Sequence, residues 1–222
     1  MLFLKALIFN TLFYGSTAIL SVAILPTLLL PRRAYLRVLM VYFHWVTFLE
    51  RVILGLSYRV EGKENLPKDG AYILGMKHQS AYETMKLHIL FGDVTAILKR
   101  ELLWIPIWGW HAAKLRLIPI DRSARGKAIP AMIDSARTLI EKDPHRPIVI
   151  FPQGTRVAPG VSTDDRPYKI GIVRLYEALN IPIVPVALNA GLFWGRNAFL
   201  KRGGVVTFKI LPPFAPGGAE QE

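Results

Sequence analysis

The sequence predicts an α/β domain that follows a membrane-anchoring helical segment. From Ser57 onward, short runs of β-branched residues alternate with amphipathic helical patterns, which is typical of α/β folds. Residues 6–30, by contrast, are dominated by Leu, Ile, Phe, Val and Ala. The 222 residues suffice for one domain with a full hydrophobic core. We therefore predict anchoring or interfacial helices over residues 1–56 and one globular domain over residues 57–222.

The first apolar segment has the length of a membrane span. No charged residue occurs between Lys5 and Arg32, and about 20 apolar residues suffice to cross a bilayer. A cleaved signal peptide would carry a shorter apolar core and a small-residue cleavage site, whereas this run continues to Leu30. Arg32 and Arg33 favour a cytoplasmic position for its end, so that the globular domain would face the cytoplasm. Spanning and one-sided insertion both stay open.

The second apolar segment, residues 34–58, differs from the first because charged and polar side chains interrupt it. These are Arg37, His44, Glu50 and Arg51. An interfacial helix combines an apolar face with such a polar face, and a second span is less compatible with them. We expect an interfacial helix here, and a core helix of the globular domain is the alternative.

Seven strands and three helices are predicted in the globular domain. The strands cover residues 58–61, 71–74, 94–98, 115–120, 147–151, 183–188 and 205–210. The helices cover residues 81–91, 127–142 and 170–180. Apolar residues recur at helical spacing from Ile129 to Ile140, and we assign them to the core.

The charge of the chain narrows the classes of partner. A formal net charge of +12 attracts nucleic acids, anionic lipid head groups and acidic carrier proteins. Among these, the apolar anchor favours lipid over nucleic acid. The sequence contains no cysteine, which excludes a disulfide, a thiolate nucleophile and a cysteine metal site. We expect no nucleic-acid partner and no metal.

Three short segments carry the candidate chemistry. They are KHQSAYET at residues 77–84, FPQGTR at 151–156 and IPIVPV at 181–186. Together they resemble the blocks of the glycerolipid acyltransferases, specifically the 1-acyl-sn-glycerol-3-phosphate acyltransferase family. Those blocks read H-x4-D, F-P-E-G-T-R and an apolar strand bracketed by prolines, and a looser middle block ends in an arginine. The resemblance covers residues 59–211.

The resemblance implies both a fold and an activity. The fold would be a mixed sheet flanked by helices. The activity would be transfer of a fatty acyl group from acyl-CoA or acyl carrier protein to the free hydroxyl of 1-acyl-sn-glycerol 3-phosphate, giving phosphatidate for phospholipid biosynthesis. No cofactor is implied, because the acyl donor is a substrate. The partners would be the lysophospholipid and the bilayer, at the cytoplasmic face of the inner membrane.

Acyl transfer of this kind needs a general base for the acceptor hydroxyl. The resemblance assigns this role to His78, which follows a predicted strand, at the sheet edge where open α/β folds bind ligands. Glu83 matches the family's aspartate and would orient His78; alternatively, it closes a capping box with Ser80. Residues five apart on one regular helix point about 140° apart, so His78 and Glu83 can meet only across a loop and a helix start.

Four further residues would bind the acceptor phosphate. By the resemblance, they are Arg156, Gly154, Thr155 and Arg122. A guanidinium fits phosphate oxygens bidentately, and a glycine lets the backbone approach a ligand closely. Gln153 replaces the family's glutamate in this block. Without the resemblance, a surface ion pair with Asp121 explains Arg122 equally well.

Other interpretations of these residues stay open. With the same chemistry, the acceptor could be glycerol 3-phosphate or a lyso-aminolipid. A catalytically silent lipid-binding protein is suggested by the departures from the family pattern at Glu83 and Gln153. A serine hydrolase is disfavoured, because the sequence has no G-x-S-x-G nucleophile elbow.

An aromatic cluster precedes the arginine of the middle block. Trp104, Trp108 and Trp110 alternate there with Ile105 and Ile107. Such a cluster is typical of a membrane interface and equally of core packing, and the sequence does not choose between the two.

Overall fold

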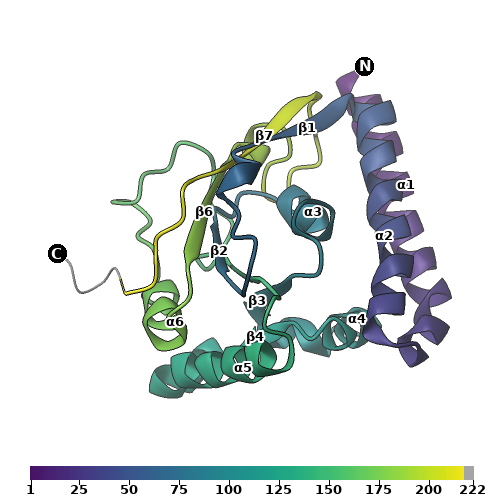
Figure 1. Ribbon diagram of the computed structural model, residues 1–222. Coiled ribbons are helices and arrows are strands. Elements are labelled where there is room, and N and C mark those ends of the chain that lie inside the picture. The colour runs from purple at the N-terminus through teal and green to yellow at the C-terminus, as the bar shows by residue number, and fades with distance from the viewer. Residues whose placement is uncertain (218–222) are drawn as a thin grey trace.

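The computed structural model describes residues 1–217, with the backbone alone at residue 125. A seven-stranded sheet forms the centre, with helices on both faces (Figure 1). The strands are β1 (Leu56–Glu61), β2 (Ile73–Met76), β3 (Thr95–Lys99), β4 (Ile118–Ile120), β5 (Ile148–Ile150), β6 (Ile183–Leu188) and β7 (Gly204–Ile210). Each predicted strand overlaps an observed one. The predicted α/β fold is therefore confirmed.

The sheet is mixed, with strand order β1-β7-β6-β2-β5-β3-β4. All neighbouring strands are parallel except β6 and β7. Strands covered on both faces are apolar throughout, and β5 is accordingly Ile-Val-Ile, fully buried. Because β2, β5, β3 and β4 run in the same direction, the segments that follow them meet at one edge of the sheet.

Two layers of helices cover the sheet (Figure 1). The helices are α1 (Leu2–Ala23), α2 (Arg32–Leu49), α3 (Tyr82–Phe91), α4 (Trp108–Lys114), α5 (Ala128–Lys142) and α6 (Gly171–Leu179). Side chains alternate between the two faces along each strand. Ile73 and Ile148 accordingly pack against α5 and α6, whereas Leu74 and Val149 belong to the core beneath α3, α1 and α2.

The stretch 108–117 differs from the prediction. Residues 115–117 were assigned to a strand, but they close the unpredicted helix α4. Leu115 N–H donates to His111 O, and Leu117 N–H donates to Ala112 O. Arg116 between them has a left-handed φ of 53°. These bonds end the helix and delay β4 until Ile118.

The N-terminal helices α1 and α2 lie side by side (Figure 1), joined by the short 3-10 helix η1 (Leu25–Leu29). Among the described residues, α1 alone is long and apolar enough to cross a membrane, and only 22% of its apolar window is buried. Its buried residues lie between Ala6 and Phe13. Lys201 Nζ, itself buried, donates to Asn10 Oδ1 at 2.6 Å. These contacts dock α1 onto the globular domain.

The helix predicted over residues 34–58 ends earlier than expected. The α-helical part, α2, ends at Leu49. One π-helical turn, η2 (Glu50–Leu54), follows it directly. Gly55 then adopts a left-handed φ of 67°, which ends the helix, and β1 begins at Leu56. The division into residues 1–56 and 57–222 stays a prediction, and residues 218–222 lie outside the described part.

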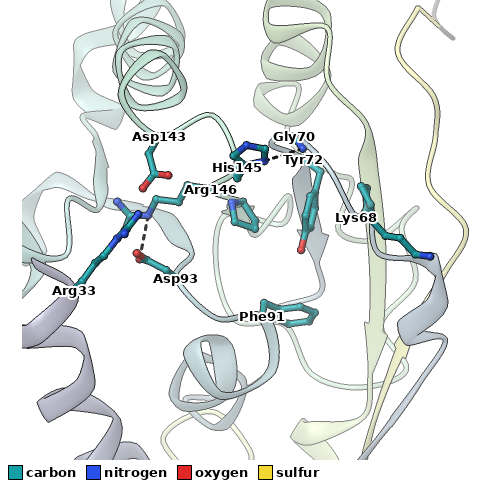
Figure 2. A pocket seen from close by; sticks show the side chains of 11 residues that line it. Arg33, Lys68, Gly70, Tyr72, Phe91, Asp93, Asp143, His145 and Arg146 are labelled. Atoms are coloured by element: carbon teal, nitrogen blue, oxygen red, sulfur yellow. Dashed lines mark hydrogen bonds and ion pairs between the residues drawn. The ribbon is translucent and has the colours of Figure 1, made fainter.

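A network of ion pairs fixes α2 at the amino ends of the strands. Arg146 is buried and donates to Val94 O at 2.9 Å and to Leu115 O at 2.6 Å. Figure 2 shows its side chain pointing at Asp93, with Asp143 nearby, beside a cavity of about 350 Å³. Arg32, the first residue of α2, also pairs with Asp93 and Asp143. This edge is opposite to the carboxyl ends of the strands.

A second ion pair joins η2 to α3 inside the protein. Glu50 and Lys86 have fully buried side chains and pair with each other. Lys86 Nζ also donates to Thr47 Oγ1 at 2.7 Å and lies 4.7 Å from the centre of the Tyr82 ring. Burial raises the pKa of Glu50 and lowers the pKa of Lys86, although each charge partly offsets the shift of the other.

Candidate active site

His78 lies in the loop between the carboxyl end of β2 and the start of α3. Its Nδ1 is 2.8 Å from Glu83 Oε1. Glu83 is in the first turn of α3, and its side chain is fully buried. The pair therefore meets across a loop and a helix start, as two residues five positions apart require.

Glu83 Oε1 also accepts hydrogen bonds from the backbone N–H groups of Gln79 and Ser80, both at 2.7 Å. Ser80 Oγ in turn accepts from Tyr82 N–H at 3.1 Å. The capping interaction and the contact with His78 therefore exist together. The bonds that begin the helix also hold the carboxylate against the imidazole.

The FPQGTR segment supports His78 from the other side. Gln153 Oε1 accepts the backbone N–H of His78 at 2.8 Å, and Val157 N–H donates to His78 O at 2.8 Å. The Phe151 ring stacks on the imidazole, with ring centres 4.1 Å apart. The glutamine that replaces the family's glutamate thus bonds to the histidine loop, and two motifs far apart in sequence form one unit.

Cationic side chains line the same cavity as His78. Arg122 and Arg156 are among them, and Gly154 and Thr155 line the cavity as well. Gly154 has a left-handed φ of 68°, and a Cβ there would be 3.6 Å from Arg122 Nη2 and 3.6 Å from Lys169 Cγ. The turn at Gly154 therefore lies directly beside Arg122 and Lys169.

The alternative role for Arg122, a surface pair with Asp121, is wrong. Asp121 Oδ2 instead accepts from Arg100 at 2.9 Å, and its Oδ1 accepts from Ser123 N–H at 2.9 Å. Within residues 1–217, no carboxylate pairs with Arg122 or Arg156. Both guanidinium groups are available for an anionic ligand.

The sequence motifs did not identify Lys169 and Arg196, which are among the cationic residues of the cavity. Lys169 follows the exposed loop after the FPQGTR segment, and Arg196 follows β6 with its Nη1 3.4 Å from Arg156 O. Neither stands in a motif, and single basic residues in loops carry no signal of their own. Only the folding of distant loops onto one edge of the sheet reveals them.

The cavity has a volume of about 1070 Å³ and combines this polar region with apolar walls. The walls come from several helices and include Leu20, Ile24, Leu39, Phe43, Met85 and Met132. A ligand with an anionic head and a long apolar chain matches such a lining. Among the described residues, no group of three His, Asp or Glu side chains is placed to hold a metal ion.

Comparisons with known proteins identify relatives of this chain. The family model described as "Acyltransferase" matches residues 57–189. A 1-acyl-sn-glycerol-3-phosphate acyltransferase of Pseudomonas aeruginosa is 35% identical over 187 residues, covering 83% of this chain and 70% of that protein. A protein of the same name from Limnanthes douglasii is 32% identical over 197 residues, covering 86% and 66%.

A human relative named 1-acyl-sn-glycerol-3-phosphate acyltransferase alpha is 29% identical over 170 residues, covering 76% of this chain and 58% of its own length. The crystal structure of the 1-acyl-sn-glycerophosphate (LPA) acyltransferase from Thermotoga maritima superposes with a TM-score of 0.73 at 21% identity, covering 98% and 89% of the two chains. This structural likeness supports the fold. With the family model matching more than half of the sequence, the chain belongs to the acyltransferase family that includes the 1-acyl-sn-glycerol-3-phosphate acyltransferases.

Proposed function

We propose that this protein transfers a fatty acyl group from acyl-CoA or acyl carrier protein to the free hydroxyl of 1-acyl-sn-glycerol 3-phosphate, giving phosphatidate. The observation that carries the proposal is the position of His78. It lies in a cavity that holds unpaired arginines for a phosphate and apolar walls for acyl chains. No cofactor takes part in this proposal, because the thioester itself is the activated group.

In the proposed reaction, the hydrogen bond to Glu83 leaves Nε2 of His78 for the acceptor. Nε2 takes the proton of the glycerol hydroxyl while the hydroxyl oxygen attacks the thioester carbonyl carbon. The tetrahedral intermediate then collapses, the carbon–sulfur bond breaks, and the imidazolium returns the proton to the thiolate. Glu83 holds Nδ1 throughout and stabilises the imidazolium charge.

The cations would position the acceptor through its phosphate. Arg156 and Arg122 offer planar guanidinium groups for bidentate bonds, and Lys169 adds a point charge beside Gly154. A phosphomonoester carries more charge than the diester of most phospholipids, so this arrangement favours lysophosphatidate. Glycerol 3-phosphate shares the phosphate but offers no acyl chain to the apolar walls.

The helices α1 and α2 would hold the enzyme on the inner membrane, with the domain facing the cytoplasm. The exposed side of α2 carries two neighbouring stripes. Arg33, Arg37 and His44 fall within roughly 40° of one another around the helix axis. Val41, Trp45 and Phe48 form the adjacent apolar stripe. Such a helix lies in the bilayer interface, with its cations among anionic head groups.

A transfer assay with labelled acyl donors tests the proposal. The purified protein in lipid is given acyl-CoA or acyl carrier protein as donor, and lysophosphatidate, glycerol 3-phosphate or a lyso-aminolipid as acceptor. Phosphatidate formed from lysophosphatidate is the expected product. If product forms only with one of the other acceptors, the enzyme catalyses the same reaction on that acceptor and lysophosphatidate is not its substrate. No product with any acceptor, while lipid still binds, would indicate the catalytically silent lipid-binding protein.

Replacing Arg156 with glutamine is expected to raise KM for lysophosphatidate by roughly 10- to 100-fold, because a charge-assisted bond to phosphate is worth about 1.5–3 kcal/mol. The KM for the acyl donor should change little. Steady-state kinetics with each substrate varied in turn measures both values. Arg166→Gln, on the exposed loop nearby, is the matched control and should leave both constants unchanged.

Replacing Glu83 with glutamine is expected to lower kcat by roughly 10²- to 10⁴-fold, since the amide stabilises an imidazolium less well than the carboxylate does. Its side-chain oxygen can still accept the backbone N–H groups of Gln79 and Ser80. The melting temperature should therefore fall much less than the activity. A variant with wild-type kcat would show that Glu83 serves only as a helix cap.

A further inference from the structure

Five apolar side chains form an exposed patch on the 3-10 helix η4 (Arg100–Trp104), on α4 and on the short link between them. This tryptophan patch comprises Leu102, Trp104, Ile105, Trp108 and Trp110. Trp104 is 70% exposed and Trp110 is 57% exposed. The sequence left core packing and a membrane interface as alternatives, and this exposure excludes core packing for the tryptophans. Large apolar side chains gathered on a surface are typical of an interaction site.

The backbone holds the tryptophan patch in a fixed shape. A Cβ at Gly109 would come within 1.9 Å of Leu103 O, so only glycine allows η4 to lie against α4. Gly109 N–H donates to Ile105 O at 2.8 Å. Ile107 between the two elements adopts a left-handed φ of 68°, which is strained for a β-branched residue. A rigid turn therefore presents the indole rings to the outside.

The patch is fastened to the tip of the α1–α2 pair. His111 on α4 donates from Nε2 to Ser21 O at 2.8 Å, and its Nδ1 accepts from Tyr35 OH at 2.9 Å. The same tip exposes Leu29 and Leu30. The exposed apolar surface of α1 and η1 thus continues onto α4, which packs against η1.

The patch also borders the cavity that contains His78. Leu102 and Trp108 line this cavity, together with Ser21 and Ile24 at the end of α1. Lys114 and the exposed Arg116 lie at the end of α4, where they suit anionic head groups. Tryptophan is enriched at membrane interfaces, because its ring is apolar and its N–H needs a polar partner.

We propose that the tryptophan patch is a second bilayer-contact surface beside α1 and α2, and that lipid substrates pass over it from the bilayer into the cavity. The bilayer contact is inferred from the exposure of the patch and from its continuity with the apolar surface of α1 and η1. The passage of lipid substrates into the cavity rests in addition on the proposed function. The two parts are tested separately.

Fluorescence quenching tests the contact. Vesicles of phosphatidylethanolamine and phosphatidylglycerol with brominated acyl chains are mixed with the wild type and with Trp104→Phe/Trp110→Phe. The chain has five tryptophans, and the quenched fraction of emission should fall in the double variant. An equal quenched fraction in both proteins overturns the contact. So does a Trp104→Ser/Trp110→Ser protein that loses an oligomer in detergent, because the patch would then bind a second protein.

Acyl transfer tests the passage. For Trp104→Ser/Trp110→Ser, the rate on long-chain lysophosphatidate in vesicles should fall roughly tenfold, because two indoles that each bury on the order of 150–250 Å² leave the bilayer. The rate on a water-soluble short-chain acceptor should stay within about twofold of wild type, since Trp104 and Trp110 lie outside the cavity lining. Phe214→Ser, at an exposed position near the C-terminus, is the control and should change neither rate.

The outcomes separate the two proposals. An equal loss of rate on both acceptors, or no loss on vesicles, overturns the passage. A wild type that turns over neither acceptor contradicts the proposed function, whereas quenching still decides the contact.

Discussion

The variant His78→Ala is expected to transfer acyl groups roughly 10²- to 10⁴-fold more slowly than the wild type, because it removes the general base. The loss should appear in kcat with little change in KM. The imidazole acts on the proton that is transferred in the transition state, whereas the cations bind the phosphate of the bound acceptor. Glu83 bonds to Nδ1 of the ring and Phe151 stacks on it, while Gln153 accepts the backbone N–H of the same histidine. Single-turnover rates at saturating acceptor measure the effect.

His145→Ala is the matched control for this experiment. His145 lies at the opposite edge of the sheet, in the smaller cavity, where Nδ1 accepts the backbone N–H of Gly70 (Figure 2). This variant should keep wild-type kcat. A His78→Ala protein with wild-type kcat and an unchanged melting temperature would contradict the assignment of His78 as the base.

Local patterns predicted the strands and the helices α3, α5 and α6 well, because each depends on residues close in sequence. β6 is correct at both ends, and α5 begins one residue later than predicted. The errors lie where tertiary contacts decide. α4 is a short helix held by Gly109 against η4 and by His111 against α1 and α2. None of these contacts leaves a periodic pattern in residues 108–114.

In the candidate site, too, local motifs were predictable from the sequence and tertiary contacts were not. The motifs located His78, Glu83 and Arg156 individually, and the resemblance supplied their roles. The helix start at Tyr82 then explains how His78 and Glu83 meet, and the capping box with Ser80 as N-cap predicts a start one residue earlier, at Ala81. The sequence could not place Lys169 beside Gly154, or α1 at the wall of the cavity, because both depend on the packing of distant segments.

The buried pair of Glu50 and Lys86 leads to the second large expected effect, on stability. Lys86→Met removes one partner and leaves the Glu50 carboxylate buried without a counter-ion. The loss of a partner in a buried pair costs about 3–5 kcal/mol. Denaturant unfolding in detergent should therefore show a much lower midpoint for Lys86→Met at neutral pH.

The pH dependence distinguishes a buried charge from lost packing. Even beside Lys86, burial raises the pKa of Glu50 from its ordinary 4.5 to about 7, and removal of the lysine raises it further. Glu50 in the folded variant then retains a proton that the unfolded chain releases above pH 4.5. The free energy of unfolding therefore falls as pH rises from 4.5 to the raised pKa of Glu50. The stability of Lys86→Met should be closest to that of the wild type near pH 5 and furthest below it near pH 8.

The double variant Glu50→Gln/Lys86→Met completes this test. With no ionisable group left at either position, the steep pH dependence should disappear, and part of the lost stability should return at pH 8. Replacing both members of a buried pair is often neutral, whereas replacing one is costly. If Lys86→Met were equally unstable at pH 5 and pH 8, the loss would come from other lost contacts of the lysine, such as those of its Nζ with the Tyr58 and Tyr82 rings, and not from the charge of Glu50.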